Sequence, residues 1–127
     1  RSLRTLPSKG EAMSLEWEQI VIDSPNPFTL GRWWARALGW VIVDENDTEI
    51  EIRQTPDRLP GIIVGIDREE KVVKNRLHLD FRPDDQDSEV ARLLALGARR
   101  VDVGQTGDEP WVVLADPEGN EFCILDG

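Results

Sequence analysis

Short runs of apolar and β-branched residues alternate along the chain with two longer stretches of helical periodicity. In the first half, this pattern predicts a helix from Pro27 to Leu38, with Asn26 as its N-cap and Gly39 as its end. Strands are predicted over residues 15–22, 40–43, 48–53 and 61–66. The first half therefore has the predicted order β-α-β-β-β.

The second half repeats this order after a charged connector at residues 67–74. A helix is predicted to begin at Asp84 and Asp85 and to end before Gly97. Strands are predicted over residues 76–82, 98–103, 111–115 and 121–125. The second half is therefore also predicted to be β-α-β-β-β.

The two halves match at a constant offset of 58 residues, which indicates an internal duplication. The matched pairs are Pro25 with Pro83, Asn26 with Asp84, Leu38 with Leu96 and Gly39 with Gly97. The sequence thus predicts an α+β domain over residues 15–127, built from tandem modules at 15–67 and 75–126. Residues 1–14 lack this periodicity and are predicted to be a flexible extension or an expression remnant.

Composition and charge narrow the class of partner. With 39% hydrophobic and 31% charged residues among 127, the chain has the composition of a globular domain. Its formal charge of −10 excludes nucleic acid and argues against an anionic membrane, and it favours a small organic molecule or a protein partner. No apolar run has the length of a membrane helix. A single cysteine favours a reducing compartment, so a cytoplasmic location is expected.

Two adjacent tryptophans stand on the first predicted helix. Phe28, Trp34, Ala35 and Leu38 recur at helical spacing and are expected to be its buried face. Because Trp33 and Trp34 are neighbours on a helix, only one is expected to face the core. The other is expected at a module or dimer interface, which favours a homodimer.

The single histidine lies on a predicted strand that alternates between two faces. His78 shares one face with Arg76 and Asp80, while Leu77 and Leu79 lie on the other. A histidine on a polar face is a candidate metal ligand, general base or hydrogen-bonding residue of a cleft. The alternative is a structural histidine whose partner is Asp80 or Arg76.

Several motifs in this order resemble the vicinal oxygen chelate superfamily, also called the glyoxalase/bleomycin-resistance/dioxygenase superfamily. In the first module they are Asn26-Pro27 at the helix start, the pair Trp33-Trp34 and the helix end Leu38-Gly39-Trp40. In the second module, Lys74-Asn75-Arg76-Leu77-His78-Leu79-Asp80 and Asp116-Pro117-Glu118-Gly119-Asn120-Glu121-Phe122 resemble its glyoxalase-like domain branch. The resemblance covers residues 15–126.

This resemblance implies that the two modules form an incomplete barrel around a cleft. Metal-dependent members hold a divalent ion with ligands from the first and last strands of each module, and the ion acts as a Lewis acid. Carried onto this chain, the first-strand positions fall on Gln19 and His78. The last strand of module one, Gly61 to Ile66, offers no ligand side chain, and Cys123 occupies the position where the family usually has glutamate. Glu121 lies two residues earlier on the same face.

The remaining candidate residues each have two interpretations. Cys123 is expected to be a small buried apolar residue, and it would be a reactive thiolate only beside a cationic group. Trp111 is either an apolar wall of the cleft or a packing residue. Basic residues of the connector (Lys71, Lys74 and Arg76) either attract an anionic ligand group or are simply solvated.

Two functions follow from the sequence. The first is a glyoxalase-like enzyme of the lyase, isomerase or dioxygenase type, with His78 as the catalytic residue and a divalent metal ion held by Gln19 and His78. The alternative is a metal-free protein of the resistance type that binds or sequesters a small organic molecule. In both, Asp80, Arg76, Trp111 and Cys123 are expected to line the cleft.

Overall fold

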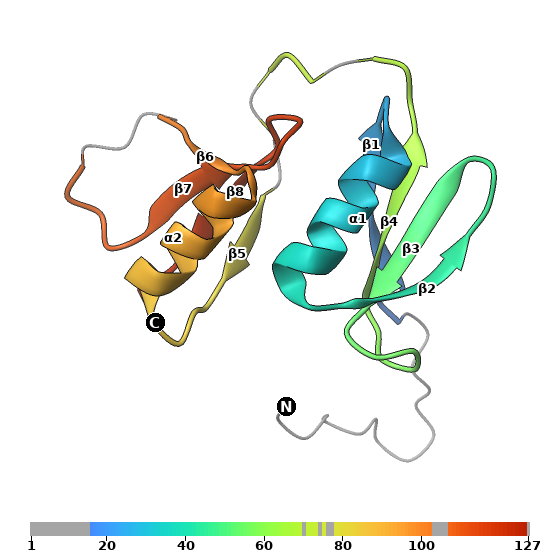
Figure 1. Cartoon of the computed structure of the whole chain (residues 1–127), viewed down its shortest axis with the longest axis horizontal. Coiled ribbons are helices and arrows are strands. Elements are labelled where there is room, and N and C mark those ends of the chain that lie inside the picture. The colour runs from blue at the N-terminus through green and yellow to red at the C-terminus, as the bar shows by residue number, and fades with distance from the viewer. Residues whose placement is uncertain (1–15, 70, 74, 76–77, 103–106, 127) are drawn as a thin grey trace, which may run out of the picture.

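The computed structural model describes residues 16–69, 71–73, 75, 78–102 and 107–126. The predicted extension at 1–14 lies outside these residues, as does Arg76. Within them the chain forms two modules, each with one helix packed on a four-stranded sheet (Figure 1). Neither described helix has the length and apolar content that a membrane-spanning segment requires.

The first module has the predicted order of elements. They are β1 (Gln19–Ser24), α1 (Pro27–Leu38), β2 (Val41–Glu45), β3 (Glu49–Arg53) and β4 (Gly61–Ile66). The strands are ordered β1-β4-β3-β2 in the sheet, and only the β1–β4 pair is parallel. In this pair, Gln19 lies opposite Gly61 and Ser24 opposite Ile66.

The second module repeats the topology of the first. Its elements are β5 (Leu79–Phe81), α2 (Gln86–Leu96), β6 (Arg99–Arg100), β7 (Val112–Ala115) and β8 (Glu121–Ile124). The strand order β5-β8-β7-β6, with β5 and β8 parallel, corresponds strand for strand to the first sheet. The predicted α+β fold of two tandem β-α-β-β-β modules is confirmed.

The helix ends agree with the sequence prediction better than the helix starts. Gly39 and Gly97 end the helices with φ values of 68° and 113°, a left-handed conformation that favours glycine. Asn26 is the N-cap of α1, but its side chain makes no capping hydrogen bond. The N-cap of α2 is Asp85, which accepts from the Ser88 N–H at 3.0 Å, so the predicted match of Asn26 with Asp84 is wrong by one residue.

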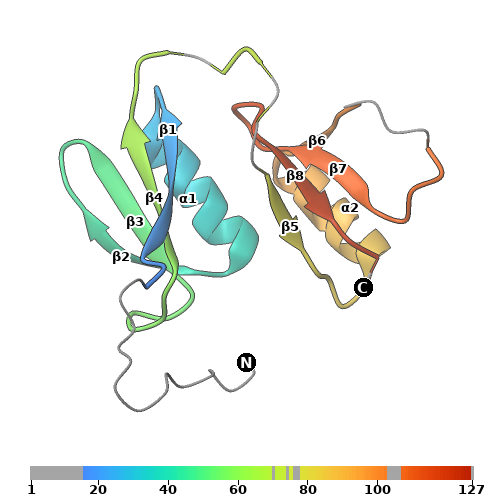
Figure 2. The same cartoon turned by 180° about the vertical axis from the view of Figure 1, so that it is seen from behind.

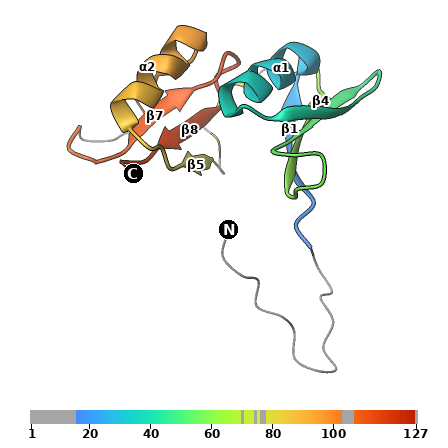
Figure 3. The ribbon, with the colours of Figure 1, turned by 60° about the horizontal axis from the view of Figure 1, so that its bottom comes forward.

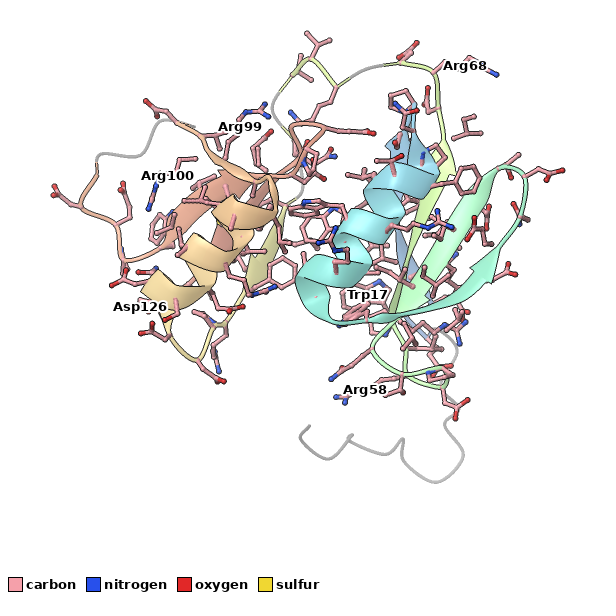
Figure 4. All side chains as sticks on the ribbon, in the orientation of Figure 1. Trp17, Arg58, Arg68, Arg99, Arg100 and Asp126 are labelled. Atoms are coloured by element: carbon pink, nitrogen blue, oxygen red, sulfur yellow. The ribbon has the colours of Figure 1, made fainter. Side chains whose placement is uncertain are left out.

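Several strands are shorter than predicted. Within the segment predicted as a strand at 98–103, the outer edge strand β6 covers Arg99 and Arg100 (Figure 4). The Val101 N–H still donates to the Val113 carbonyl at 3.3 Å beyond the end of β6. β5 covers three residues instead of seven, although residues 76–77 lie outside the described part of the chain. Trp111 precedes β7 and lies outside it.

Both helices lie on the same side of the molecule, and the sheets lie on the other (Figures 2 and 3). The core therefore forms between helices and sheets, and β3 and β4 contribute alternate residues to it. Ile50 and Ile52 of β3 and Phe122 and Ile124 of β8 belong to one cluster of buried residues that spans both modules. Gly31 allows α1 to approach β3 closely, because a Cβ atom there would lie 2.3 Å from the Ile50 Cγ2 atom.

Both tryptophans of α1 are buried within the single chain, at 8% and 2% exposure, so both belong to the core, and the module interface is confirmed as the one of the two expected interfaces that covers them. The reason is that the second module covers the side of α1 that its own sheet leaves free. Trp33 Nε1 donates to the Leu96 carbonyl at 2.8 Å, and Trp34 stacks edge-on against Phe122 with ring centroids 4.9 Å apart. The tryptophan pair therefore gives no argument for a dimer.

A buried carboxylate completes this contact between the modules. Asp116 is fully buried, and its Oδ2 atom accepts from Trp34 Nε1 at 2.9 Å. Its Oδ1 atom accepts from the backbone N–H groups of Glu118 and Asn120, both at 2.9 Å. One side chain thus shapes the turn between β7 and β8 and fixes that turn to α1.

Replacing Asp116 should therefore weaken the whole fold. Asp116→Ala is expected to lower the free energy of unfolding by about 2–4 kcal/mol, because buried N–H groups lose their acceptor. Trp34→Phe should cost less, since it removes one donor and keeps an aromatic ring. Chemical denaturation measures both, with Asp57→Ala in an exposed loop as the control. An Asp116→Ala variant within about 0.5 kcal/mol of the wild type would contradict this assignment.

The capping of α2 gives a second, pH-dependent prediction. The Ser88 hydroxyl and, with a smaller effect, the Ser88 backbone N–H donate hydrogen bonds to the Asp85 carboxylate. These bonds hold the pKa of Asp85 below the usual aspartate value of 3.8. Its contribution to stability is therefore present above pH 3.8 and is lost as the pH falls through the lowered folded-state value. Asp85→Ala should lower the Tm near neutral pH and have little effect in strong acid. Asp84→Ala is the matched control, and an equal loss in that variant would show that the cap is assigned to the wrong residue.

Candidate functional site

The sheet faces turned away from the helices carry the polar residues singled out in the sequence. On β1, Gln19, Val21 and Asp23 alternate with the core-facing residues, and Val21 is 57% exposed. In the second module, Leu79 and Phe81 pack against the core, whereas His78 and Asp80 are exposed. This face therefore collects the candidate site residues of both modules.

A cavity of about 790 Å³ lies between the modules, and we call it the intermodule cavity. Both modules line it, and its residues include Trp17, Gln19, Val21, Asn75, His78 and Glu121. Trp17, labelled in Figure 4, lies just before β1 and is 62% exposed. The volume lies within the range of sites that bind small organic molecules.

The segment after β4 is tied to β8 at the edge of this cavity. Lys71 Nζ lies 2.7 Å from Glu121 Oε2, and the Asn75 N–H donates to Glu121 Oε1 at 2.9 Å. The Lys71 and Glu121 side chains are only 18% and 11% exposed. Glu121 therefore acts as a structural anchor for the chain between the modules.

A smaller cavity of about 290 Å³ lies wholly within the second module, and we call it the second-module cavity. Its lining residues are His78, Asp80, Trp111, Val113, Glu121, Cys123 and Leu125. His78 and Glu121 line both cavities, whereas Gln19 lines only the intermodule cavity. Trp111 is 42% exposed and belongs to the smaller cavity.

Three side chains converge in the second-module cavity. His78 Nε2 lies 3.2 Å from Asp80 Oδ1, and Asp80 is the register partner of Cys123 across β5 and β8. One ligand atom from each of the three residues lies within 4.8 Å of the other two. Cys123 is buried at 8% exposure, while His78 and Asp80 reach solvent.

The four-ligand metal centre implied by the resemblance does not fit these residues. β4 carries no ligand side chain, and Gly61 is the residue opposite Gln19. Gln19 and Cys123 line different cavities. Glu121 already bonds to Lys71 and Asn75. The described side chains therefore do not provide the ligands of a metal centre shared between the modules.

The structure thus divides the residues predicted for one cleft. His78 lies with Gln19 in the intermodule cavity and with Asp80, Cys123 and Trp111 in the second-module cavity. The structural role of Glu121 was not predicted, because its partners come from the connector. Trp17 was also missed, although strand alternation places it on the same face as Gln19.

Two β-α-β-β-β modules with parallel β1–β4 and β5–β8 pairs define the vicinal oxygen chelate fold. The glyoxalase-like domain family matches residues 19–125, and the chain belongs to this family. No curated protein matches the chain in sequence.

Solved structures share the fold at low sequence identity. A glyoxalase/bleomycin resistance protein/dioxygenase family enzyme from Burkholderia phytofirmans PsJN has a TM-score of 0.69 and 17% identity, covering 87% of this chain and 97% of its own. A glyoxalase/bleomycin resistance protein from Albidiferax ferrireducens T118 has a TM-score of 0.58 and 16% identity, covering 85% and 95%. The oxidase ChaP-H2 has a TM-score of 0.59 and 12% identity, covering 91% and 95%.

The anchoring role of Glu121 can be tested by hydrogen exchange. Glu121→Ala should speed exchange of the Asn75 amide about tenfold, because the amide loses its acceptor. Glu69→Ala is the matched control, since it removes another carboxylate that lines the intermodule cavity and leaves these bonds intact. Unchanged Asn75 exchange in Glu121→Ala would show that another contact holds the segment.

Proposed function

We propose that the protein binds a small organic molecule in the intermodule cavity. The observation that carries this proposal is the cavity itself, about 790 Å³ in volume and lined by both modules. Trp17 and Val21 offer apolar surface, and Gln19, Asn75 and His78 offer polar groups around it. A mainly apolar wall with a few convergent polar groups is typical of small-molecule sites.

The charges around the cavity indicate the class of ligand. The described lining residues include four carboxylates, Asp23, Asp67, Glu69 and Glu121. The lysine among them, Lys71, is paired with Glu121. Four carboxylates and one paired lysine disfavour an anion, so the ligand is a neutral or cationic molecule, and Trp17 favours one with a flat apolar part.

A second function is supported by one contact. His78 Nε2 lies 3.2 Å from Asp80 Oδ1, and a carboxylate beside an imidazole orients the ring for proton transfer. This favours an enzyme of the lyase, isomerase or dioxygenase type with His78 as general base. The two functions separate in His78→Ala, which should abolish turnover in an enzyme and leave most of the affinity of a binding protein.

The names of two proteins that share the fold support both proposals in general terms. One names a bleomycin resistance protein and another an oxidase. We also propose a cytoplasmic location, which the presence of a single cysteine in the sequence supports.

We propose a homodimer only because members of the family commonly form dimers. Sedimentation of the purified chain at micromolar concentration is expected to give the mass of a dimer. A monomeric profile across that range would refute this part of the proposal.

Ligand binding should be visible in tryptophan fluorescence. A panel of neutral and cationic polycyclic aromatic compounds is expected to include one that quenches fluorescence saturably, because bound ligand covers Trp17. The quenching should be largely lost in Trp17→Phe and retained in Trp111→Phe, since Trp111 lines the other cavity.

A blocking variant makes this experiment decisive. Val21→Arg places a long side chain at an exposed position in the cavity and should lower affinity at least tenfold without unfolding the protein. Equal affinity in Val21→Arg and wild type would place the ligand elsewhere. A panel with no saturable binder would contradict the proposal.

A further inference from the structure

We propose that a third cavity, on the helix side of the molecule, binds a small aromatic carboxylate. This helix-side cavity has a volume of about 190 Å³, and its walls come from α1, from β5 and the residues after it, from α2 and from β8. Among the described lining residues, it shares only Trp34 and Phe122 with the intermodule cavity. The inference therefore concerns a separate site and goes beyond the proposed ligand binding.

The inner wall of the helix-side cavity is aromatic. Trp34, Phe81 and Phe122 line it, and their ring centroids lie 4.9 to 6.0 Å apart. Leu38 of α1 and Leu93 of α2 add apolar surface on either side. A cavity of about 150 Å³ with an apolar lining is large enough for benzene. The helix-side cavity can therefore hold one aromatic ring with a small substituent, in edge or offset contact with the surrounding rings.

The charges of the cavity favour an anionic substituent. Arg82 and Arg92 line it together with one carboxylate, Glu89. Both Glu89 oxygens accept from Arg92, Oε2 from Nε at 3.0 Å and Oε1 from Nη2 at 2.9 Å, so that charge is already balanced. Arg82 is exposed, and no ion pair between described residues includes it. The helix-side cavity thus carries a net positive charge, in contrast to the intermodule cavity with its four carboxylates.

Arg92 also holds the cavity in shape. Its Nη2 atom donates to the Ala37 carbonyl at 2.7 Å and so joins α2 to the last turn of α1 (Figure 3 shows both helices on this side). The bonds to Glu89 and Ala37 use Nε and Nη2. Among the described residues, Nη1 has no partner, so it can donate a charge-assisted hydrogen bond to a ligand carboxylate. The ring would then lie against the aromatic wall and the carboxylate beside the two arginines.

Titration of the full chain with benzoate, followed by amide chemical shifts, tests this site. The expected result is saturable shifts at Ala37, Leu38 and Leu93, with half-saturation at roughly 1 mM or below. Benzyl alcohol, a neutral compound with the same ring, should bind about tenfold more weakly, because it lacks the charge that the arginines attract. Equal binding of the two compounds would overturn the proposal.

Three charge variants locate the anion. Arg82→Gln should weaken benzoate binding about fivefold and leave the binding of benzyl alcohol unchanged. Glu89→Gln should strengthen benzoate binding, because it releases Arg92 from its partner. Arg36→Gln is the matched control, since it removes an exposed arginine of the last turn of α1 that does not line the cavity. An equal loss in Arg82→Gln and Arg36→Gln would reduce the effect to general charge attraction and overturn the proposal.

The position of the shifts separates this site from the intermodule cavity. Benzoate shifts centred on Val21 and Asn75 would place the anion between the sheets and would also overturn the proposal. Absence of saturable shifts in folded wild-type protein at about 10 mM benzoate would do the same. None of these results depends on whether a polycyclic compound binds in the intermodule cavity, so the two proposals fail or succeed separately.

Discussion

The contact between the Asp116 carboxylate and the Trp34 indole holds the two modules in one structure. Asp116 is fully buried and accepts hydrogen bonds from Trp34 and from two backbone N–H groups of its own turn. A buried carboxylate without hydrogen-bond donors is costly. The turn and α1 therefore cannot move relative to each other without a large loss of stability. Because β8 begins directly after this turn, the same contact also sets the position of Glu121 and Cys123.

The modules depend on each other for a core. A unit of about 55 residues is marginal alone, because it buries too little of its surface. Here α1 is covered on one side by its own sheet and on the other by the second module, which receives both Trp33 and Trp34. Ser24 Oγ adds a bond to Glu118 Oε2 at 2.7 Å, so the end of β1 is also fixed to the β7–β8 turn. The intermodule cavity exists because these contacts keep the two sheets at a fixed separation.

Strand alternation was enough to predict which residues face away from the core. It placed His78 and Asp80 together on the polar face of their strand, and glycine and proline placed both helices within a residue or two. Contacts between the modules were beyond prediction, because Trp34 and Asp116 are 82 residues apart and no local pattern links them. The same limit applies to Trp33 and Trp34, for which the sequence left a module interface and a dimer interface open, whereas the second module covers both. The same limit explains why the structure has two cavities where one cleft was predicted. Alternation along a strand predicts which residues share a face, whereas the separation of Gln19 from Cys123 depends on how the two sheets pack.

These features make His78 the residue that links two sites of different chemistry. Toward the first module it faces an apolar cavity with several carboxylates, and toward β8 it faces Asp80 and a buried thiol. Amide chemical-shift mapping with a bound aromatic ligand can show whether the ligand lies between the modules. A ligand between the modules should give its largest shifts together at Val21 in the first module and at Asn75 and Glu121 on the opposite wall. Shifts confined to one module, or to the surface around the helices, would contradict it.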